Sequence, residues 1–381
     1  MTSIPQCLSV RTFVVVAPRA AWQRERMPSE RYEDLFRTWG GEFVATCHDT
    51  ATGAFMFICV HSTSRGPAAG GLRMKEYASP LDAMQDGMRL SSAMTLKMAI
   101  CDAPLGGGKS VIAIPAGALP TLRKKILTRY AALLDSVHGA YYAAPDMNTG
   151  PADMDFIYEQ TPYVFCRSAE RGGSGSTTRH TALGVFHSIL ASAEHALGTR
   201  NISGRSVAVQ GVGEVGAALV ELLVQAGARV IVSDASAERV ADVASRFGVA
   251  HAAPEQIAST PCDIYAPCAI GGVLNARSIP ELRCAAIAGA ANNQLETPED
   301  DARLRERGIV YAPDFVASAG GVLHGVGIER WRWSEAQVDA AVARLGGILL
   351  DVFAAARSGG IGTHAAAERL ARAKLGITEP S

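Results

Sequence analysis

One segment, from Val207 to Asp234, constrains the fold of this chain more than any other. Residues 207–210 have the apolar pattern of a buried strand, a helical pattern follows as far as Gln225, and residues 230–234 are typical of a second strand. Between the first strand and the helix lie six residues in the order Gly-x-Gly-x-x-Gly, namely Gly211, Val212, Gly213, Glu214, Val215 and Gly216. A strand, a glycine-rich turn, a helix and a second strand make a complete βαβ unit, which is right-handed by default. The sequence therefore predicts a parallel sheet.

The three glycines of this turn have separate physical tasks. They allow a tight turn, a close approach of the backbone to a pyrophosphate and close packing of the helix, whose N-terminus offers N–H groups to phosphates. Asp234 ends the second strand, where its carboxylate can accept hydrogen bonds from a ribose 2′-hydroxyl and would repel a 2′-phosphate. We therefore predict a dinucleotide site that prefers NAD to NADP. Arg239 leaves use of both cofactors open, although it also suits a solvated helix position.

The rest of the second half continues this alternation. Strand patterns recur at residues 264–266, 285–288 and 309–311, which predicts a doubly wound, Rossmann-type α/β domain with helices on both faces of its sheet. The stretch from Val338 to Leu375 is rich in alanine and helical in pattern, with an interruption at Gly359-Gly360.

The first half predicts a smaller α/β domain. Residues 42–60 have the pattern of a hairpin with a turn at Asp49 to Gly53, and helices are expected at 81–98 and 122–137. A strand is expected at residues 140–144. The chain of 381 residues exceeds what one ordinary core holds, so two domains are expected, and the Gly/Ser/Thr-rich stretch at 171–178 places the boundary nearby.

Two lysines stand out in this first half. Lys109 follows the triple glycine Gly106-Gly107-Gly108, where the backbone can approach a ligand closely, and a desolvated ammonium there can act as a base near neutral pH. The alternative is a flexible surface loop with a solvated lysine, but the strand pattern at 111–114 would anchor the loop. Lys97 lies near the C-terminal end of the preceding helix, and Asp146 comes just past a strand end, where α/β sites are commonly built.

Composition excludes several classes of partner. The 36 basic and 37 acidic residues give a net charge of −1, which provides no electrostatic reason to expect nucleic acid or an anionic membrane. The eight cysteines have no zinc-ligand or redox-motif spacing, so we predict no metal site and reduced thiols. No apolar run is long enough to cross a bilayer. We expect a cytoplasmic protein with a small-molecule partner and no nucleic-acid or membrane partner.

Several motifs occur in one order and together resemble a known family. They are Gly66-Pro67-Ala68-Ala69-Gly70-Gly71-Leu72-Arg73, Pro104-Leu105-Gly106-Gly107-Gly108-Lys109, Asp153-Met154-Asp155, Cys262-Asp263-Ile264-Tyr265-Ala266-Pro267-Cys268-Ala269, Ala291-Asn292-Asn293-Gln294 and Tyr311-Ala312-Pro313-Asp314. In these motifs and the glycine-rich turn, the chain resembles the glutamate/leucine/phenylalanine/valine dehydrogenases from about Tyr32 to its end.

The resemblance implies an oxidoreductase of amino-acid metabolism that deaminates an L-amino acid to a 2-oxo acid and ammonia, reversibly, with NAD as hydride acceptor. It implies a substrate and oligomerisation domain at 32–175, a nucleotide-binding domain at 176–344, a cleft between them, and a homo-oligomer. A helix at about 345–381 would pack back on the first domain. Residues 1–31 would be an atypical extension, to which we assign no function.

Residue roles follow by position in the family. The resemblance implies that Lys97 pairs with the substrate α-carboxylate, that Lys109 is the catalytic lysine that activates water, and that Asp146 is the acid/base for the amino group. Asn293, or its neighbour Asn292, would help to hold the carboxylate. The remaining implied positions are the carboxylate-binding backbone of Gly70 and Gly71, the substrate-pocket residues Ala69, Ala144, Val322 and Gly325, and the cofactor contacts Thr181, Cys268, Ala269 and Ala290.

Two positions depart from the family pattern. The chain has Arg179-His180 where the family commonly has Pro-Val before the threonine, which affects the loop that would orient the nicotinamide. Pro145 and Asn148, on either side of Asp146, look more like the glutamate dehydrogenase version. Neither departure removes a reacting group.

The small residues predict a roomy apolar pocket. Ala69 stands where leucine enzymes commonly carry leucine, and Gly325 lacks a side chain. The segment with Trp331 and Trp333 resembles that of phenylalanine dehydrogenases. We predict an aromatic substrate, phenylalanine first and tryptophan second, with leucine or another branched-chain amino acid as the alternative. Glutamate is disfavoured, because no extra basic residue is assigned to a side-chain carboxylate. The rival classes are an NAD-binding regulatory protein that has lost catalysis and a hydroxy-acid dehydrogenase with a histidine base.

Overall fold

The computed structural model describes residues 32–117 and 121–377. The predicted extension at 1–31 lies outside the described residues. The chain forms two compact units: residues 32–95 with 106–164, and residues 96–105 with the remainder from Phe165 onward. Within the described residues, no helix is long and apolar enough to cross a membrane.

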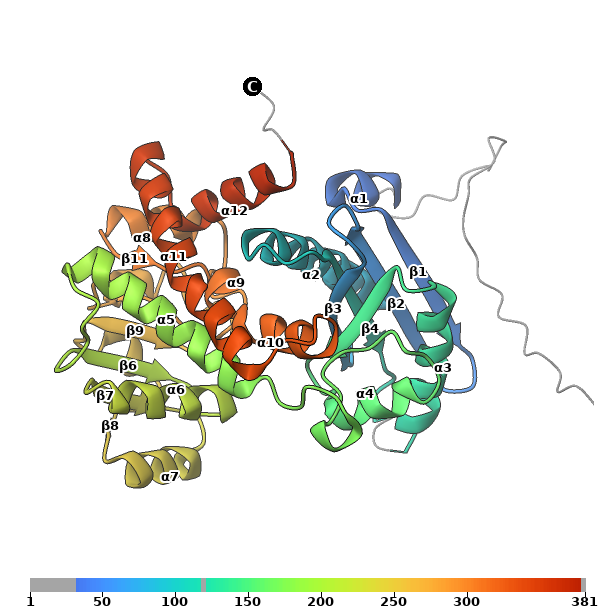
Figure 1. Cartoon of the computed structure of the whole chain (residues 1–381), viewed down its shortest axis with the longest axis horizontal. Helices are drawn as coiled ribbons and strands as arrows, with labels where there is room; N and C mark the ends of the chain where they lie inside the picture. The colour runs from blue at the N-terminus through green and yellow to red at the C-terminus, as the bar shows by residue number, and fades with distance from the viewer. Residues whose placement is uncertain (1–31, 118–120, 378–381) are drawn as a thin grey trace, which may run out of the picture. The chain divides into compact units, whose positions relative to one another are not determined.

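The first unit is built on a five-stranded mixed sheet in the order β1-β2-β4-β3-β5 (Figure 1). Its strands are β1 (Phe43–Asp49), β2 (Ala54–Ser62), β3 (Ala68–Lys75), β4 (Gly106–Ala113) and β5 (Tyr141–Pro145). The predicted hairpin is confirmed, since β1 and β2 pair antiparallel, with Asp49 opposite Ala54. Strand β3 lies between β4 and β5 and runs parallel to both, so Gly71 in the middle of β3 is paired with Ala144 near the end of β5.

Helices cover both faces of this sheet because its central strands alternate between two apolar cores. They are α1 (Tyr32–Trp39), α2 (Pro80–Ile100), α3 (Arg123–Ser136) and α4 (Pro151–Tyr158). Met56 and Ile58 of β2 face the core shared with α3 and α4, whereas Phe57 and Cys59 face the core shared with α1 and α2. The helices predicted at 81–98 and 122–137 and the strand at 140–144 are confirmed.

The segment around Lys109 differs from the prediction of a loop. Strand β4 already begins at Gly106, so the triple glycine and Lys109 lie in a central strand whose eight residues are all buried. The physical reason is close packing: a Cβ on Gly106 would meet the Ser62 carbonyl, and one on Gly107 would meet Thr95. The glycines therefore allow neighbouring backbone to come close, and they do not make the segment flexible.

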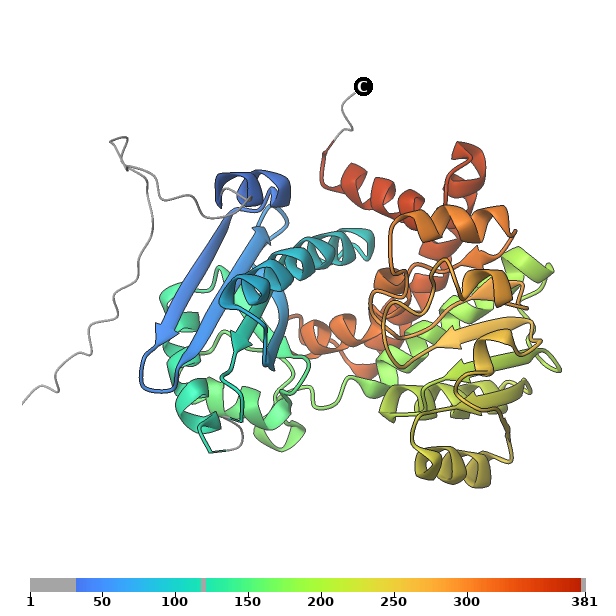
Figure 2. The ribbon, with the colours of Figure 1, turned by 180° about the vertical axis from the view of Figure 1, so that it is seen from behind.

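The second unit contains the predicted parallel sheet, drawn in yellow-green to orange (Figure 2). Its six strands lie in the order β11-β10-β9-β6-β7-β8. The strands are β6 (Ser206–Gln210), β7 (Arg229–Ser233), β8 (Ala250–His251), β9 (Ile264–Pro267), β10 (Ala286–Ile287) and β11 (Val310–Tyr311). The α-helices are α5 (Thr178–Leu197), α6 (Glu214–Gln225), α7 (Ala237–Phe247), α8 (Glu299–Glu306), α9 (Asp314–Ala317), α10 (Gly320–Glu329), α11 (Glu335–Gly359) and α12 (Thr363–Lys374). Three short 3₁₀ turns complete the unit: η1 (Ala169–Arg171), η2 (Ile257–Ser259) and η3 (Ile279–Glu281).

Each face of the parallel sheet has its own core. Helices α5, α6, α11 and α12 contribute to the core that contains Val207 and Val209 of β6. Ala208 of the same strand faces the other core, which residues from η2, η3 and α8 complete. The doubly wound Rossmann-type fold predicted from the sequence is confirmed.

The units differ from the predicted domain ranges. The first unit ends at Val164 rather than near residue 175, and Lys97 belongs to the second unit because α2 changes unit at its last turn. Helix α11 packs on α5, and α12 packs on α11 and α8, so the C-terminal helices are part of the second unit. Packing of the chain's last part on the first domain stays a prediction.

Candidate active site

Lys109 and Asp146 meet in the first unit. Lys109 projects from central strand β4, and Asp146 follows directly after β5. The Lys109 Nζ lies 2.9 Å from Asp146 Oδ2, and only 6% of Lys109 is exposed. The structure therefore joins the two residues that the resemblance assigned to catalysis, and it removes their contact from bulk water.

Arg73 and Asp86 extend this pair, and the sequence analysis did not single them out as site residues. Arg73 Nε donates to Asp146 Oδ2 at 2.9 Å, and its Nη1 donates to Asp86 Oδ2 at 3.0 Å. Arg73 ends the first family-like motif, while Asp86 stands in helix α2 with no motif around it. The motif was thus a signal for Arg73, but only the fold could reveal Asp86.

The charges of the pair follow from burial and from Arg73. Burial is the largest effect on Lys109 and lowers its pKa below the ordinary value, Asp146 opposes this, and Arg73 lowers the pKa further. Burial alone would raise the pKa of Asp146, but Lys109 and Arg73 outweigh it and lower the pKa to about 2. Asp146 is therefore ionised near neutral pH, and Lys109 releases its proton more readily than an ordinary lysine does.

Gly70 and Gly71 are glycines because no Cβ fits. A Cβ on Gly71 would lie 2.6 Å from Asp146 Cβ and 3.0 Å from Lys109 Nζ, and one on Gly70 would meet the Gly108 carbonyl. The backbone at Gly71 thus lies directly against the charged pair. Ala69 precedes it in β3, where it is 3% exposed, and Ala144 stands beside Gly71 in the sheet register.

Lys97 belongs to a polar chain in the second unit. Its Nζ donates to Ser318 Oγ at 3.0 Å, and Ser318 Oγ donates to the Asp314 carbonyl. The Asp314 carboxylate accepts the backbone N–H of Asn293 at 2.7 Å. Lys97 and Asn293, both predicted to hold the substrate carboxylate, are therefore connected through Ser318 and Asp314, which the sequence analysis had not selected.

The two asparagines are not equivalent in this arrangement. Asn293 has a left-handed backbone, with φ of 53°, and is partly buried, whereas Asn292 is exposed. The hydrogen bond to Asp314 and the unusual backbone fix Asn293 in place, so the geometry favours Asn293 as the site amide.

The glycine-rich turn of the second unit suits a dinucleotide. Gly211 has φ of 95°, and a Cβ there would lie 2.7 Å from Ala269, while a Cβ on Gly216 would meet the Gly211 carbonyl. A Cβ on Gly213, by contrast, would meet nothing within 4 Å, although helix α6 begins at the next residue. An open position at a helix N-terminus fits a pyrophosphate, so these residues fit NAD.

Asp234 lies beside the turn. Its two carboxylate oxygens accept the backbone N–H groups of Val212 and Ser236, each at 2.9 Å. Arg239 Nη1 lies 4.0 Å from Asp234 Oδ1, and the Arg239 side chain is 62% exposed. The carboxylate is thus held at the end of β7, where the sequence placed it.

Of the other predicted cofactor residues, Cys268 and Ala269 lie beside the same turn, whereas Thr181 lies at the start of α5. Cys268 donates its backbone N–H to the Gln210 carbonyl, and its thiol is hydrogen-bonded to the backbone of Ala290. Glu214 accepts a hydrogen bond from Thr178, and Val215 packs at the edge of the core under the turn. Thr181, one turn into α5, donates its hydroxyl to the Thr177 carbonyl.

Helix α10 carries the predicted pocket residues Val322 and Gly325. Its N-terminal glycines pack on α5, since a Cβ on Gly321 would lie 2.5 Å from Thr181 Oγ1. Val322 is partly buried, and Gly325 is buried. A Cβ on Gly325 would meet the Cys166 thiol, so a neighbouring side chain already fills the space that the missing side chain leaves.

Comparisons with known proteins agree with this geometry. Residues 45–163 match the dimerisation domain of the Glu/Leu/Phe/Val dehydrogenases, and residues 172–238 and 234–375 match the Glutamate/Leucine/Phenylalanine/Valine dehydrogenase domain. The chain is 38% identical over 345 residues to the leucine dehydrogenase of Geobacillus stearothermophilus, which covers 90% of this chain and 93% of that protein. The chain belongs to the glutamate/leucine/phenylalanine/valine dehydrogenase family.

Relatives with other substrates are similar to almost the same extent. The phenylalanine dehydrogenase of Thermoactinomyces intermedius is 37% identical over 345 residues, covering 90% of this chain and 93% of that protein. The crystal structure of L-tryptophan dehydrogenase from Nostoc punctiforme matches with a TM-score of 0.78 at 35% identity, covering 90% of this chain and 98% of that one. This family member is therefore an amino-acid dehydrogenase, and the expected family and enzyme class are confirmed.

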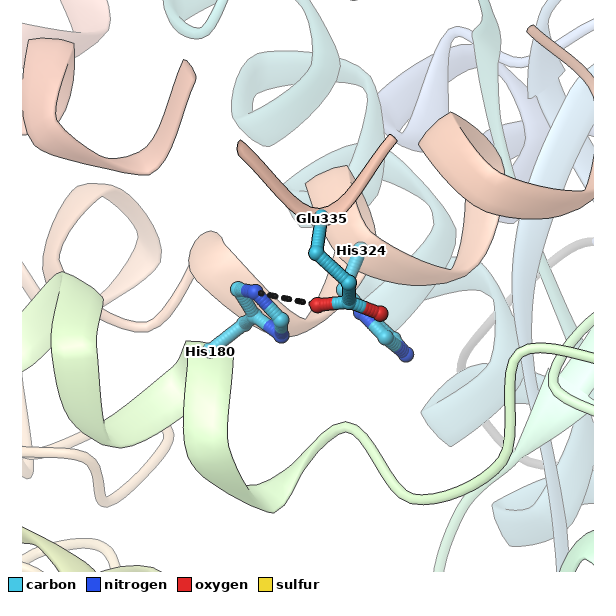
Figure 3. Close-up of side chains that lie close together, drawn as sticks. All are labelled: His180, His324 and Glu335. Carbon is cyan, nitrogen blue, oxygen red and sulfur yellow. Dashed lines mark ion pairs between the residues drawn. The ribbon is translucent and has the colours of Figure 1, made fainter. Parts of the chain in front are cut away.

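This dehydrogenase has Arg179-His180 where the family commonly has Pro-Val, and His180 belongs to a side-chain cluster at the start of α5 (Figure 3). The imidazoles of His180 and His324 stack with centroids 4.4 Å apart, and His180 Nε2 lies 3.4 Å from Glu335 Oε2. His180, His324 and Glu335 thus offer donor atoms close enough together for a metal ion.

A cation already occupies one side of this cluster. Arg179 Nη1 lies 2.7 Å from His180 Nε2 and 2.8 Å from Asp339 Oδ1. Burial is the largest effect on His180 and lowers its pKa, and His324 and Arg179 act in the same direction. The cluster therefore connects α5, α10 and α11 through the two stacked imidazoles, and the prediction of no metal site stays a prediction.

Proposed function

We propose that this protein catalyses the NAD-dependent oxidative deamination of an L-amino acid to its 2-oxo acid and ammonia, and the reverse reductive amination. The observation that carries the proposal is the buried Lys109–Asp146 ion pair against the Gly71 backbone. A lysine with a lowered pKa, beside a fixed carboxylate and a bare backbone, suits proton transfer from the water that attacks the α-carbon and to or from the amino group on it.

Each charged group then has one task. Lys97 holds the substrate α-carboxylate, and Asn293, connected to it through Ser318 and Asp314, assists. Lys109, once neutral, takes a proton from the attacking water. The glycine-rich turn and Asp234 would hold NAD, which would supply the acceptor for the hydride of the α-carbon.

The ionised state of Asp146 limits the role that it can have in the reaction. A carboxylate whose pKa is lowered to about 2 is a poor proton donor in the free enzyme, but it accepts hydrogen bonds from an ammonium group readily. We therefore propose that Asp146 first binds the substrate amino group as an acceptor, and exchanges a proton with it only when substrate displaces part of its contact with Lys109.

For the side chain we propose an aromatic substrate, phenylalanine first and tryptophan second. The small, buried Ala69 and the similarity to phenylalanine and tryptophan dehydrogenases support this proposal. The Cys166 thiol against Gly325 removes one of the sequence arguments for a roomy pocket. Leucine or another branched-chain amino acid is the alternative, and the leucine and valine dehydrogenases among the relatives support it equally.

Initial rates of NAD reduction with phenylalanine, tryptophan, leucine, valine and glutamate test this proposal. Turnover with any of the first four supports the reaction, and a higher kcat/KM for phenylalanine or tryptophan supports aromatic specificity. A preference for leucine or valine would overturn the aromatic assignment alone. No turnover with the panel in either direction, despite NAD binding, would favour a regulatory protein that has lost catalysis.

We further propose a homo-oligomer, because residues 45–163 match a dimerisation domain. Light scattering coupled to size-exclusion chromatography measures the assembly directly. A monomer at the enzyme concentrations of the assay would contradict this part of the proposal.

A further inference from the structure

The Asp146 carboxylate has two cationic partners on the same oxygen. Asp146 Oδ2 accepts from Lys109 Nζ at 2.9 Å and from Arg73 Nε at 2.9 Å. The Arg73 side chain is 13% exposed, so this second contact is also shielded from water. The charge of Asp146 is therefore shared, and Lys109 alone does not neutralise it.

Arg73 is fixed at its other end by a second carboxylate. Its Nη1 lies 3.0 Å from Asp86 Oδ2, and the Tyr77 hydroxyl donates to the same oxygen at 2.8 Å. Arg89 donates to the remaining oxygen, Oδ1, at 2.9 Å. Asp86 stands on helix α2 and Arg73 on strand β3, so the guanidinium extends from a helix carboxylate to the carboxylate beside Lys109.

The planar guanidinium is suited to this position. It presents several N–H donors in a rigid fork, so one side chain can hold two carboxylates in fixed directions, whereas a lysine offers one point charge. A second cation nearby also lowers the pKa of a lysine, because that cation competes for the carboxylate and repels the ammonium charge.

The charged groups around Lys109 act in both directions. Asp146 and Asp86 raise its pKa, while burial and Arg73 lower it. Removal of Arg73 would stabilise the ammonium form of Lys109 for two reasons. A cation that repels the ammonium is lost, and the Asp146 carboxylate then pairs with Lys109 alone.

We infer that Arg73 is a positioning residue, which holds the Asp146 carboxylate at a fixed place beside Lys109 and is itself held by Asp86. The inference rests on the proposed function, since it assigns Arg73 a part in preparing Lys109 for catalysis. In this role Arg73 does not contact the substrate.

The first experiment is the pH dependence of kcat/KM for wild type, Arg73→Gln, Arg73→Lys and Arg123→Gln. Activity rises with pH as Lys109 loses its proton, so Arg73→Gln should move the midpoint of this rise upward by about one pH unit. Arg73→Lys keeps the charge but not the fork, so a smaller shift with a lowered kcat is expected.

Arg123→Gln is the matched control. Arg123 lies in the same unit, where its Nε and Nη2 donate to Asp153 at 2.9 and 2.7 Å. Its Nη2 also donates to the Asn148 carbonyl at 2.7 Å, but within the described residues no hydrogen bond or ion pair joins it to Asp146 or Lys109. Its loss should lower thermal stability and leave the midpoint unchanged. An equal midpoint shift in this variant would show that Arg73 acts through general stability, and would overturn the inference.

A second measurement is independent of turnover. Trace acetylation of Lys109 with acetic anhydride, followed across pH by peptide mass spectrometry against exposed Lys124, reports the fraction of neutral amine in the free enzyme. Arg73→Gln should move this labelling curve upward in pH by the same amount. If Arg73→Gln does not fold, Arg73→Lys provides both measurements.

The outcomes separate the two hypotheses. An active Lys109→Ala variant would refute the proposed mechanism, while the labelling curve would still test Arg73. An inactive Lys109→Ala variant together with unchanged midpoints and labelling curves for both Arg73 variants would overturn the assignment of Arg73 alone.

Discussion

The two glycine-rich segments of this dehydrogenase use glycine for opposite reasons. In the first unit, protein atoms fill the space where a Cβ on Gly71 or Gly107 would stand. In the second unit, Gly216 of the glycine-rich turn is packed in the same way, but Gly213 faces open space. The fold itself requires the packed glycines, whereas only an approaching ligand can require Gly213. Glycine in a motif therefore indicates a ligand contact only where the surrounding structure leaves room.

The two regions also carry charge differently. The first unit buries an ion-paired network in which we propose that Lys109 and Asp146 take part in the reaction, while Arg73 and Asp86 hold them in place. The nucleotide-binding unit presents backbone N–H groups and one carboxylate, Asp234, that itself accepts backbone N–H groups. Substitutions should therefore affect kcat in the first region and cofactor binding in the second.

Lys109→Ala is the most severe test of this contrast. Loss of the general base should lower kcat by about 10³-fold or more, with NAD affinity within a few-fold of wild type. Initial rates and fluorescence titration with NADH measure the two effects. The exposed Lys124→Ala variant serves as control, and a Lys109→Ala enzyme with substantial activity would refute the role of Lys109.

Gly71→Ala should come next in size. The new methyl group would push on Asp146 and on the Lys109 ammonium, so we expect kcat/KM to fall by about 100-fold while NAD binding is preserved. Gly150→Ala is the matched control, because a Cβ there meets nothing within 4 Å. Equal activity of both variants would show that the close contact at Gly71 has no catalytic consequence.

Gly213→Ala and Gly216→Ala separate ligand contact from packing. Gly213→Ala should leave the melting temperature unchanged and raise KM for NAD by about tenfold or more, because the methyl group enters the space for the pyrophosphate. Gly216→Ala should lower stability by about 1–3 kcal/mol, because its methyl group meets the Gly211 carbonyl. Thermal melts with and without NAD decide the matter, and a destabilised Gly213→Ala protein would contradict the distinction.

Asp234→Asn should have the smallest effect. The amide keeps one acceptor oxygen but loses the charge that would repel a 2′-phosphate, so KM for NAD should rise by up to about tenfold and the preference over NADP should shrink. Steady-state kinetics with both cofactors measures the ratio. An unchanged ratio would indicate that another group, such as the nearby Arg239, sets cofactor choice.

Local patterns in the sequence predicted much of the fold. The βαβ unit around Gly211, the hairpin at 42–60 and the helices at 81–98 and 122–137 all agree with the structure, because each depends on the period of apolar residues and on nearby turn residues. The loop expected at Lys109 was wrong for the opposite reason. Glycines typical of a loop were placed in a buried strand by close contacts with Ser62 and Thr95, which are distant in sequence.

The sequence by itself determined which groups are candidates for binding and catalysis: Lys97, Lys109, Asp146, the glycine-rich turn and Asp234 each lie in or beside a short local pattern. Only the tertiary structure decided their partners. Arg73 and Asp86 beside Asp146, Ser318 beside Lys97 and Cys166 against Gly325 come from elements far apart in the chain. Short-range patterns encode elements and motifs, but the charge state of a buried group depends on whatever the fold places within a few ångströms of it.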